Sequence, residues 1–278
     1  MQNSSKGALF RALHERDGLL ALPNPWDIGS SRILANLGFE ALATTSAGHA
    51  YSLGLPEGMV PRAAVLAHCR ALSQATDLPV SADLGKGFGD SPEAVVQTIA
   101  AAAATGLAGC SIEDHTGRRD DPIFEFGLAV ERVEAAVHAV RALPHDFVLT
   151  ARCENLRWGH ADLKDTIKRL RAYERAGADV LYAPALPDLE SIRTVCASLT
   201  NPVNVLMGLP GATFSTTELA NVGVKRISVG SALARLSFAA LIDAGREIKQ
   251  SGTFQFASRA ADFSELEDHF RTWRRAEP

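Results

Sequence analysis

The sequence of 278 residues has no Cys-x-x-Cys pair, no long apolar run and no excess of basic residues. Its four cysteines are scattered, so neither a structural zinc site nor a redox dithiol is indicated. With 28 basic and 32 acidic residues the net charge is −4, and no basic stripe is present that would bind phosphate backbones. We therefore expect neither nucleic acid nor a membrane as a partner.

Two features of targeted or membrane-inserted chains are also missing. The N-terminal stretch MQNSSKGALFRALHERDG is polar and amphipathic, whereas a signal peptide has a charged start followed by an apolar core. No apolar run approaches the roughly 18 residues of a membrane span. The sequence therefore predicts a soluble, cytoplasmic protein, and its hydrophobic content of 46% allows a sizeable core.

Short apolar runs alternate with helix-like segments along the whole chain. Runs that are apolar on both faces are typical of strands buried in a parallel sheet. Eight of them occur, at residues 19–23, 40–45, 78–83, 108–114, 147–152, 178–184, 202–207 and 224–230. A glycine suited to a helix C-terminus precedes several of these runs, as in NLGFEAL, ATGLAGC, RAGADVL and NVGVKRI.

This alternation predicts an α/β fold, a (β/α)8 TIM-type barrel whose active site lies at the carboxyl ends of the strands. A doubly wound open sheet is the alternative, but no GxGxxG follows the first run, and polar residues follow nearly every run. No linker divides the chain. We expect one domain over residues 1–278, in which residues 234–278 form an additional C-terminal helical region used in oligomerisation.

Polar side chains collect just past the apolar runs, where the ends of barrel strands meet. They include Asn24, Trp26, Asp27, Thr45, Ser46, Asp83, Glu113, His115, Arg152, Glu154 and Asn204. Acids on several strands suit Mg²⁺, which binds through carboxylates and waters. Arg152 would pair with a substrate carboxylate, and the backbone N–H groups near Ser46 and Ala47 could hold an oxyanion. Asp27 could instead cap a helix, and Glu154 could be the structural partner of Arg152.

At these positions the sequence resembles the phosphoenolpyruvate mutase/isocitrate lyase superfamily, and within it the carboxyvinyl-carboxyphosphonate phosphorylmutase-like branch. The resemblance extends from Leu19 to Leu233 and rests on LPNPWDIGSSRIL, TTSAGHAYSLGLPEG, SADLGKGFGD, GCSIED, TARCENLRWG, PVNVLMG and ISVGSAL. It implies a Mg²⁺-dependent barrel that acts on 2-oxo or 2-hydroxy carboxylates through enolate-like intermediates. It also implies a tetramer in which a C-terminal helix is exchanged between subunits.

The resemblance also implies roles for individual residues. By motif position, Asp83 resembles the direct metal ligand, while Glu57 and Glu113 resemble acids that hold metal-bound waters. We take Ser46, Glu113 and Arg152 as candidate catalytic residues. The candidate substrate-binding residues are Trp26, Thr45, Ser46, Ala47, Gly48, Asp83, Arg152 and Asn204.

The sequence departs from the superfamily in the loop that begins at His115. This loop reads HTGRRDDPIFEFG and has neither the cysteine of the isocitrate and methylisocitrate lyases nor the asparagine of the phosphonate mutase. The sequence therefore favours a lyase or decarboxylase acting on a small (di)carboxylate. A P–C bond mutase or phosphonate hydrolase, and a catalytically weakened metabolite-binding barrel, stay open as alternatives.

The stretch SADLGKGFGD contains a second departure. Related sequences commonly carry an acid two residues after the strand-end aspartate, and Gly85 occupies that position here. The loss of one carboxylate predicts weak Mg²⁺ binding. Lys86 either turns toward the metal or points to solvent.

The C-terminal segment FSELEDHFRTWRRAEP is strongly amphipathic. Its apolar residues could dock on a neighbouring subunit, which predicts a homo-oligomer and specifically a homotetramer. The alternative is that the segment folds back on its own barrel. The apolar residues concerned are Phe263, Leu266, Phe270 and Trp273.

Overall fold

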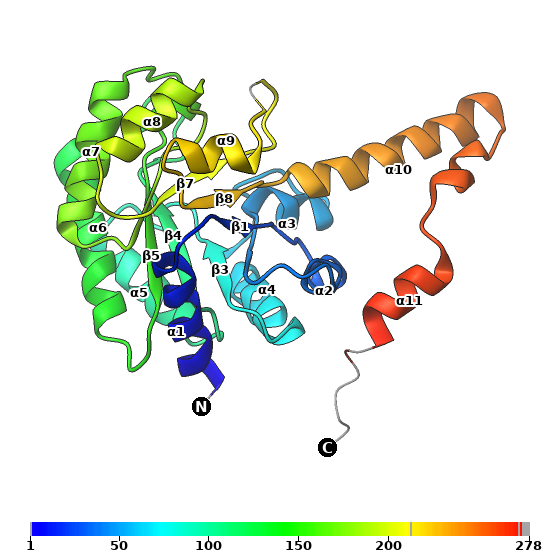
Figure 1. Cartoon of the computed structure of the whole chain (residues 1–278), viewed down its shortest axis with the longest axis horizontal. Helices are drawn as coiled ribbons and strands as arrows, with labels where there is room; N and C mark the ends of the chain where they lie inside the picture. Colours follow the sequence, from blue (N-terminus) through cyan, green and yellow to red (C-terminus); the bar gives the residue numbers. More distant parts are fainter. Residues whose placement is uncertain (1, 212, 272, 274–278) are drawn as a thin grey trace.

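Eight parallel strands form the centre of the molecule in a computed structural model that describes residues 2–211, 213–271 and 273 (Figure 1). The order of hydrogen-bonded neighbours is β1-β8-β7-β6-β5-β4-β3-β2. The strands are β1 (Leu20–Leu22), β2 (Leu42–Ala43), β3 (Val80–Asp83), β4 (Gly109–Glu113), β5 (Val148–Arg152), β6 (Val180–Tyr182), β7 (Val203–Leu206) and β8 (Arg226–Ser228). Each strand lies within one of the eight apolar runs, so the strand prediction is confirmed.

The sheet curls into a nearly closed barrel, with its seam between β1 and β2. Ala43 N donates to Pro23 O across this seam at 3.1 Å. The buried side chain of Asn24 strengthens the closure, because its Nδ2 donates to Thr44 O at 3.0 Å and its Oδ1 accepts from Val229 N at 2.8 Å. The prediction of a (β/α)8 barrel is therefore confirmed, and the open-sheet alternative is wrong.

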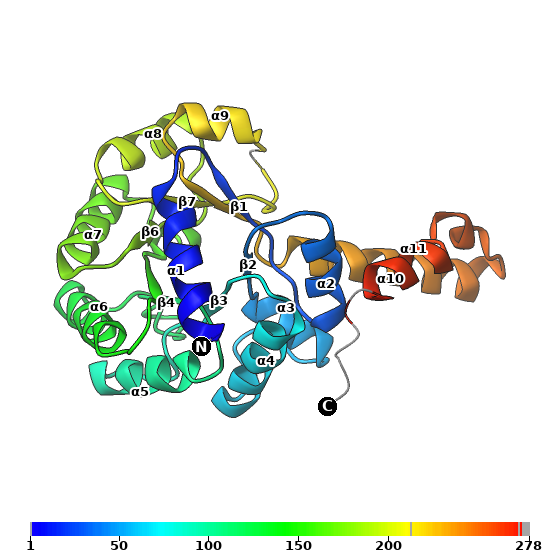
Figure 2. The same cartoon turned by 60° about the horizontal axis from the view of Figure 1, so that its bottom comes forward.

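Helices surround the barrel (Figure 2). They are α2 (Ile28–Asn36), α3 (Ser46–Ser52), α4 (Arg62–Ala75), α5 (Pro92–Ala103), α6 (Phe126–Arg141), α7 (Leu163–Ala176), α8 (Leu189–Ala197) and α9 (Thr216–Asn221), with the short 3₁₀ helix η1 (Asn155–Trp158) after β5. Apolar side chains between strands and helices form the main core, which includes Leu72, Ile99, Val133 and Leu170. This layer holds the strands rigidly, and polar side chains can therefore be presented at their ends.

Helix α1 (Gln2–Glu15) lies across the amino-terminal end of the barrel (Figure 2). Phe10 and Leu13 are buried there against Leu20, Val148 and Val180, which stand near the starts of three strands. Burial of two large apolar side chains stabilises this cover by about 3–6 kcal/mol before entropy is subtracted. Helix α1 thus closes the barrel at the amino-terminal ends of its strands. The candidate site therefore has to lie at the opposite end, where the strands have their carboxyl termini.

The chain leaves the barrel after β8 through the long helix α10 (Ala232–Ser251), then turns at η2 (Gln255–Arg259) and returns as α11 (Phe263–Arg271) (Figure 1). All residues of α10 are described, and among them only Ala234 is buried. Leu236 and Leu241 are 68% and 65% exposed. No helix among the described residues is long and apolar enough to cross a membrane.

Helix α11 packs against α2 of its own chain. Asn36 Nδ2 donates to His269 O at 2.6 Å, and the Arg32 guanidinium lies 5.9 Å from the Trp273 ring centre. Within one chain the segment thus folds back, as the alternative interpretation had it. Phe263 is nevertheless 90% exposed, and the predicted contact with a second subunit stays a prediction.

Candidate functional site

The register of the sheet places five site residues in one row. Glu113 on β4 pairs with Arg152 on β5, and Arg152 pairs with Tyr182 on β6. Tyr182 pairs in turn with Asn204 on β7, and Asn204 pairs with Arg226 on β8. Because alternate residues of a strand point to the same side, the row fixes which side chains share a level of the barrel. Each residue of the row lies beside the next one, although the row spans 114 positions of the sequence.

A cavity of about 50 Å³ lies inside the barrel at the carboxyl ends of the strands. Four of the predicted substrate residues line it, namely Thr45, Asp83, Arg152 and Asn204. The remaining lining is also mostly polar. It includes Asn24, Thr44, Ser81, Ser111, Tyr182, Arg226 and Ser228. A cavity of this chemistry suits a small polar molecule much better than an apolar one.

Arg152 lies at the centre of a group of carboxylates. Its Nη1 is 3.6 Å from Asp83 Oδ2 and 3.4 Å from Glu113 Oε2, and its Nε donates to Glu154 Oε1. Its guanidinium also lies over the Tyr182 ring, 4.9 Å from the ring centre. The interpretation of Glu154 as a structural partner of Arg152 is confirmed. The Arg152 guanidinium is held in place before any substrate arrives.

Ser46 connects two of the predicted metal-binding acids. Its Oγ lies 2.9 Å from Asp83 Oδ2 and 3.1 Å from Glu57 Oε1, and it can donate its proton to one of them at a time. Thr45 positions Ser46, because its side chain caps α3 by accepting from Gly48 N at 3.2 Å. Ser46, Asp83 and Glu57 are therefore gathered at one place.

The turn after β3 orients Asp83. Asp83 Oδ1 accepts from Gly85 N at 3.1 Å, and Asp83 N donates to Thr44 Oγ1 at 2.9 Å. Gly85 has a left-handed φ of +54°, which glycine adopts without strain. A Cβ atom at position 85 would lie 3.9 Å from Glu113 Oε1. A side chain at this position would therefore face the acids, as the comparison with related sequences implied.

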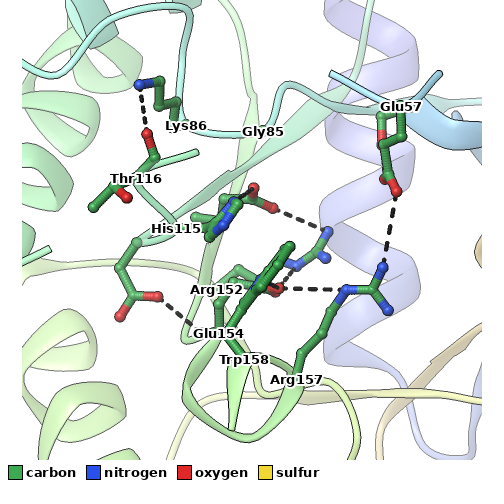
Figure 3. Close-up of polar contacts among 12 residues, drawn as sticks. Glu57, Gly85, Lys86, His115, Thr116, Arg152, Glu154, Arg157 and Trp158 are labelled. Carbon is green, nitrogen blue, oxygen red and sulfur yellow. Dashed lines mark hydrogen bonds and ion pairs between the residues drawn. The ribbon is translucent and has the colours of Figure 1, made fainter. Parts of the chain in front are cut away.

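Lys86 adopts neither of the two orientations considered from the sequence. Its Nζ is 2.5 Å from Asp90 Oδ1 and donates to Thr116 O at 2.7 Å, and its side chain is 32% exposed. Figure 3 shows Lys86 directed toward Thr116, away from Arg152. The ammonium group is thus paired with the Asp90 carboxylate and the Thr116 carbonyl. Lys86 thus ties the loop after β4 to the turn after β3.

An aromatic stack borders the carboxylates. The rings of His115 and Trp158 are 3.9 Å apart and nearly parallel, and Trp158 Nε1 donates to Glu154 Oε2 at 3.2 Å (Figure 3). Burial lowers the pKa of His115, so the neutral imidazole is favoured. Asp114 is buried, and its Oδ1 accepts a hydrogen bond from the backbone N of Glu154 at 2.8 Å. The stack and this support limit the movement of Glu154.

The charges around the cavity are unbalanced toward the negative. Four carboxylates, those of Asp83, Glu113, Glu154 and Glu57, lie within 4.0 Å of the guanidinium groups of Arg152 and Arg157. Burial, together with the charges of Glu154 and Asp83, raises the pKa of Glu113 well above its ordinary value. The described residues include no cluster of three side chains spaced to hold a metal ion. The side chains still suit a hard cation, because carboxylate oxygens are its preferred ligands and the four carboxylates outnumber the two guanidinium groups that face them.

Four predicted substrate residues are absent from the cavity lining, namely Trp26, Ser46, Ala47 and Gly48. Gly48 is closely packed, since a Cβ atom there would lie 3.2 Å from Trp26 Cβ. His68 Nε2 lies 2.9 Å from the carbonyl oxygen of Trp26. Asp27 caps α2 through Ser30 N, which confirms its capping interpretation. Trp26 and Gly48 thus shape the wall that carries Ser46.

Sequence reasoning missed the floor of the cavity. Arg226 is 4% exposed and donates through Nε to Asn204 Oδ1 at 2.8 Å and through Nη2 to Thr150 Oγ1 at 3.0 Å. Burial lowers the pKa of Arg226 to about 10. One signal was present in the sequence. A charged residue in the middle of the apolar run VKRISVG is unusual for a buried strand.

Comparisons with known proteins agree with this geometry. The sequence profile of the phosphoenolpyruvate phosphomutase family matches residues 10–249. The chain is 30% identical to 2-methylisocitrate lyase of Escherichia coli K12 over 234 residues, which are 81% of this chain and 78% of that one.

Solved structures are also similar. The crystal structure of a Burkholderia cenocepacia J2315 protein is 51% identical, with a TM-score of 0.95 over 100% of this chain and 98% of the other. A 2,3-dimethylmalate lyase is 28% identical, with a TM-score of 0.84 over 96% of this chain and 94% of the other. On this sequence and structural similarity, the chain belongs to the phosphoenolpyruvate mutase/isocitrate lyase superfamily.

Proposed function

We propose that this chain is a Mg²⁺-dependent C–C bond lyase or decarboxylase that acts on a small 2-oxo or 2-hydroxy (di)carboxylate through an enolate-like intermediate. The observation that carries the proposal is the preorganised Arg152 guanidinium, held among Asp83, Glu113 and Glu154 at the cavity. Relatives named as 2-methylisocitrate lyase and 2,3-dimethylmalate lyase support the reaction class.

The excess of carboxylates supports the choice of cofactor. Asp83 would hold Mg²⁺ directly, and Glu113 and Glu57 would hold its waters, because Mg²⁺ keeps several waters and uses few protein ligands. When bound, the ion would polarise the substrate oxygens and stabilise the negative charge of an enolate. The side chain of Ser46 lies between Asp83 and Glu57 and orients both.

Arg152 has the substrate-binding role in this proposal. Its Nε is used by Glu154, whereas its Nη1 lies at 3.4 Å and 3.6 Å from two acids, which is too far for strong hydrogen bonds. A substrate carboxylate would therefore compete with only these two weak contacts for the Nη groups. The backbone N–H groups of Ser46 and Ala47 would receive the enolate oxygen, and the stack of His115 on Trp158 would limit access of water.

Turnover of a panel of small 2-oxo and 2-hydroxy acids, with and without Mg²⁺, tests the proposal. We expect Mg²⁺-dependent cleavage, and we expect Arg152→Ala to weaken binding of the active acid at least tenfold, since charge-assisted hydrogen bonds contribute about 1.5–3 kcal/mol. Arg118→Ala is the control, because Arg118 is outside the cavity lining and pairs with Asp90 and Asp121. Unchanged affinity in Arg152→Ala would refute the assignment.

A P–C bond mutase or phosphonate hydrolase is the second candidate, and the phosphoenolpyruvate phosphomutase profile favours it. Release of phosphate from phosphonates would identify it. The glycine at position 85 supports a third candidate, a catalytically weakened barrel that binds a metabolite. Tight binding of a small acid without any turnover would identify that one.

We also propose that the chain forms a homo-oligomer, specifically a tetramer. Helix α10 supports this, because it leaves the barrel with Leu236, Leu241 and Ile242 exposed (Figure 1). Such apolar side chains gathered on one helix are usually covered by another surface.

A further inference from the structure

Arg226 is a cation at the floor of the cavity, deep in the barrel. It begins β8 and pairs in register with Asn204, one strand away. It lines the same cavity as Arg152, and only 4% of its surface is exposed. The two guanidinium groups come from β5 and β8, with Tyr182 of β6 and Asn204 of β7 between them in the row of paired residues.

The environment of Arg226 differs from that of Arg152. Its hydrogen-bond partners are the Asn204 amide oxygen, the Thr150 hydroxyl and His14 Nε2 at 3.3 Å. His14 is buried and its pKa is lowered to about 3, first by burial, so the imidazole is neutral at pH 7. Across the described residues, no carboxylate comes within 4.0 Å of the Arg226 guanidinium, whereas Arg152 and Arg169 each pair with carboxylates.

The guanidinium also has unused hydrogen-bonding capacity. An arginine side chain has five N–H donors, and the three contacts of Arg226 use three of them. Two donors therefore remain beside a cavity whose wall also carries the hydroxyl groups of Ser81 and Ser111. A buried charge without a counter-ion is costly in free energy, and an anion in the cavity would compensate it.

We propose that Arg226 binds a second carboxylate of the substrate at the floor of the cavity, and so selects dicarboxylates over monocarboxylates. Arg152 binds the carboxylate that lies nearer the acids. This inference rests on the proposed function, because it assumes an anionic substrate. It goes further by assigning the choice between one and two carboxylates to a residue of β8.

Tartronate and lactate are the probes, because they differ only in a carboxylate that replaces a methyl group. Their affinities are measured by calorimetry with Mg²⁺ for the native chain and for Arg226→Met. We expect Arg226→Met to weaken tartronate at least about tenfold and lactate less than about threefold, as the loss of charge-assisted contacts predicts. Arg226→Lys keeps the charge without the planar fork of the guanidinium group, so its affinity for tartronate should fall between those of the native chain and Arg226→Met.

Thermal unfolding separates binding from a structural role. Methionine removes an uncompensated buried charge but also the donor to Asn204, Thr150 and His14, so the Tm of Arg226→Met is measured to show that the variant is folded at the temperature of the binding assay. Thr150→Val is the matched control, because it removes one neutral partner of Arg226 and keeps the charge. We expect this variant to keep the preference for tartronate.

The possible outcomes distinguish the two proposals. Equal weakening of tartronate and lactate in Arg226→Met, or no weakening of either, overturns the role of Arg226 and leaves the proposed function standing. Failure of the native chain to bind either acid overturns both. If Arg226→Met does not fold, Arg226→Lys decides, since an unchanged ratio of the two affinities overturns the assignment.

Discussion

Replacing Gly85 by glutamate should tighten Mg²⁺ binding, because position 85 faces the acids of the site. A Cβ atom there would lie 3.9 Å from Glu113 Oε1, and the turn is already fixed by the hydrogen bond from Gly85 N to Asp83 Oδ1. The added carboxylate would restore the acid that related sequences commonly carry. It would also add to the negative charge that surrounds Arg152.

The size of the effect follows from the distances. At about 5 Å and an effective dielectric constant of about 20, a carboxylate attracts a divalent ion by about 7 kcal/mol. Dehydration and ordering of the new side chain offset most of this, so a net gain of about 1.5–3 kcal/mol is expected, as for other charge-assisted contacts. That gain corresponds to roughly tenfold to hundredfold tighter binding.

A side chain at position 85 also strains the backbone, since φ is +54°. This strain costs about 1 kcal/mol of folding stability. Gly85→Gln carries the same strain and the same shape without the charge, so it is the matched control. Calorimetry of Mg²⁺ binding compares the two variants. Equal affinities in Gly85→Glu and Gly85→Gln would refute the reasoning and place position 85 away from the metal.

Three further changes test the closure of the barrel, the buried histidine of α1 and the proposed oligomer. Asn24→Ala removes the three hydrogen bonds of a buried side chain and should lower the free energy of unfolding by about 3 kcal/mol in urea titrations; a loss below about 1 kcal/mol contradicts the closure role. Because burial lowers the pKa of His14 to about 3, its contribution to stability is present above its unfolded pKa of about 6.5 and is lost as the pH falls toward 3. Acid unfolding curves of His14→Gln should show a weaker pH dependence, and identical curves would contradict this. Leu236→Glu combined with Leu241→Glu should yield monomers in sedimentation velocity runs at micromolar concentration, and a native chain that is itself monomeric refutes the oligomer.

The barrel could be predicted from the sequence because its strands are buried on both faces. Runs such as FVLTAR and ADVLYAP carry apolar residues at consecutive positions, so both faces of the strand are largely apolar, which is not typical of surface strands. The limits of the strands were less predictable. Strand β2 covers only Leu42–Ala43 within a run predicted at 40–45, because Thr44 and Thr45 are already used at the cavity and as the cap of α3.

The candidate site could be predicted where residues follow strand ends, and not where a contact joins distant loops. Asp83, Glu113 and Arg152 come directly from the ends of their strands, so the barrel geometry alone brings them together. The position of Lys86 depends on the Thr116 carbonyl, which lies 30 positions further along the chain. No local pattern reveals such a partner, and the two orientations considered from the sequence left it out.

Arg152 and Arg226 show why the sequence alone could not apportion the charges of the cavity. Arg152 stands in a strand-end position and attracts attention as the substrate-binding residue, yet it is surrounded by Asp83, Glu113 and Glu154. A substrate carboxylate must therefore compete with these acids, and a divalent ion that engages Asp83 and Glu113 would remove most of that competition. Arg226 has no such competitors among the described residues. It follows that affinity at Arg152 should depend on Mg²⁺, whereas affinity at Arg226 should depend on the second carboxylate of the substrate.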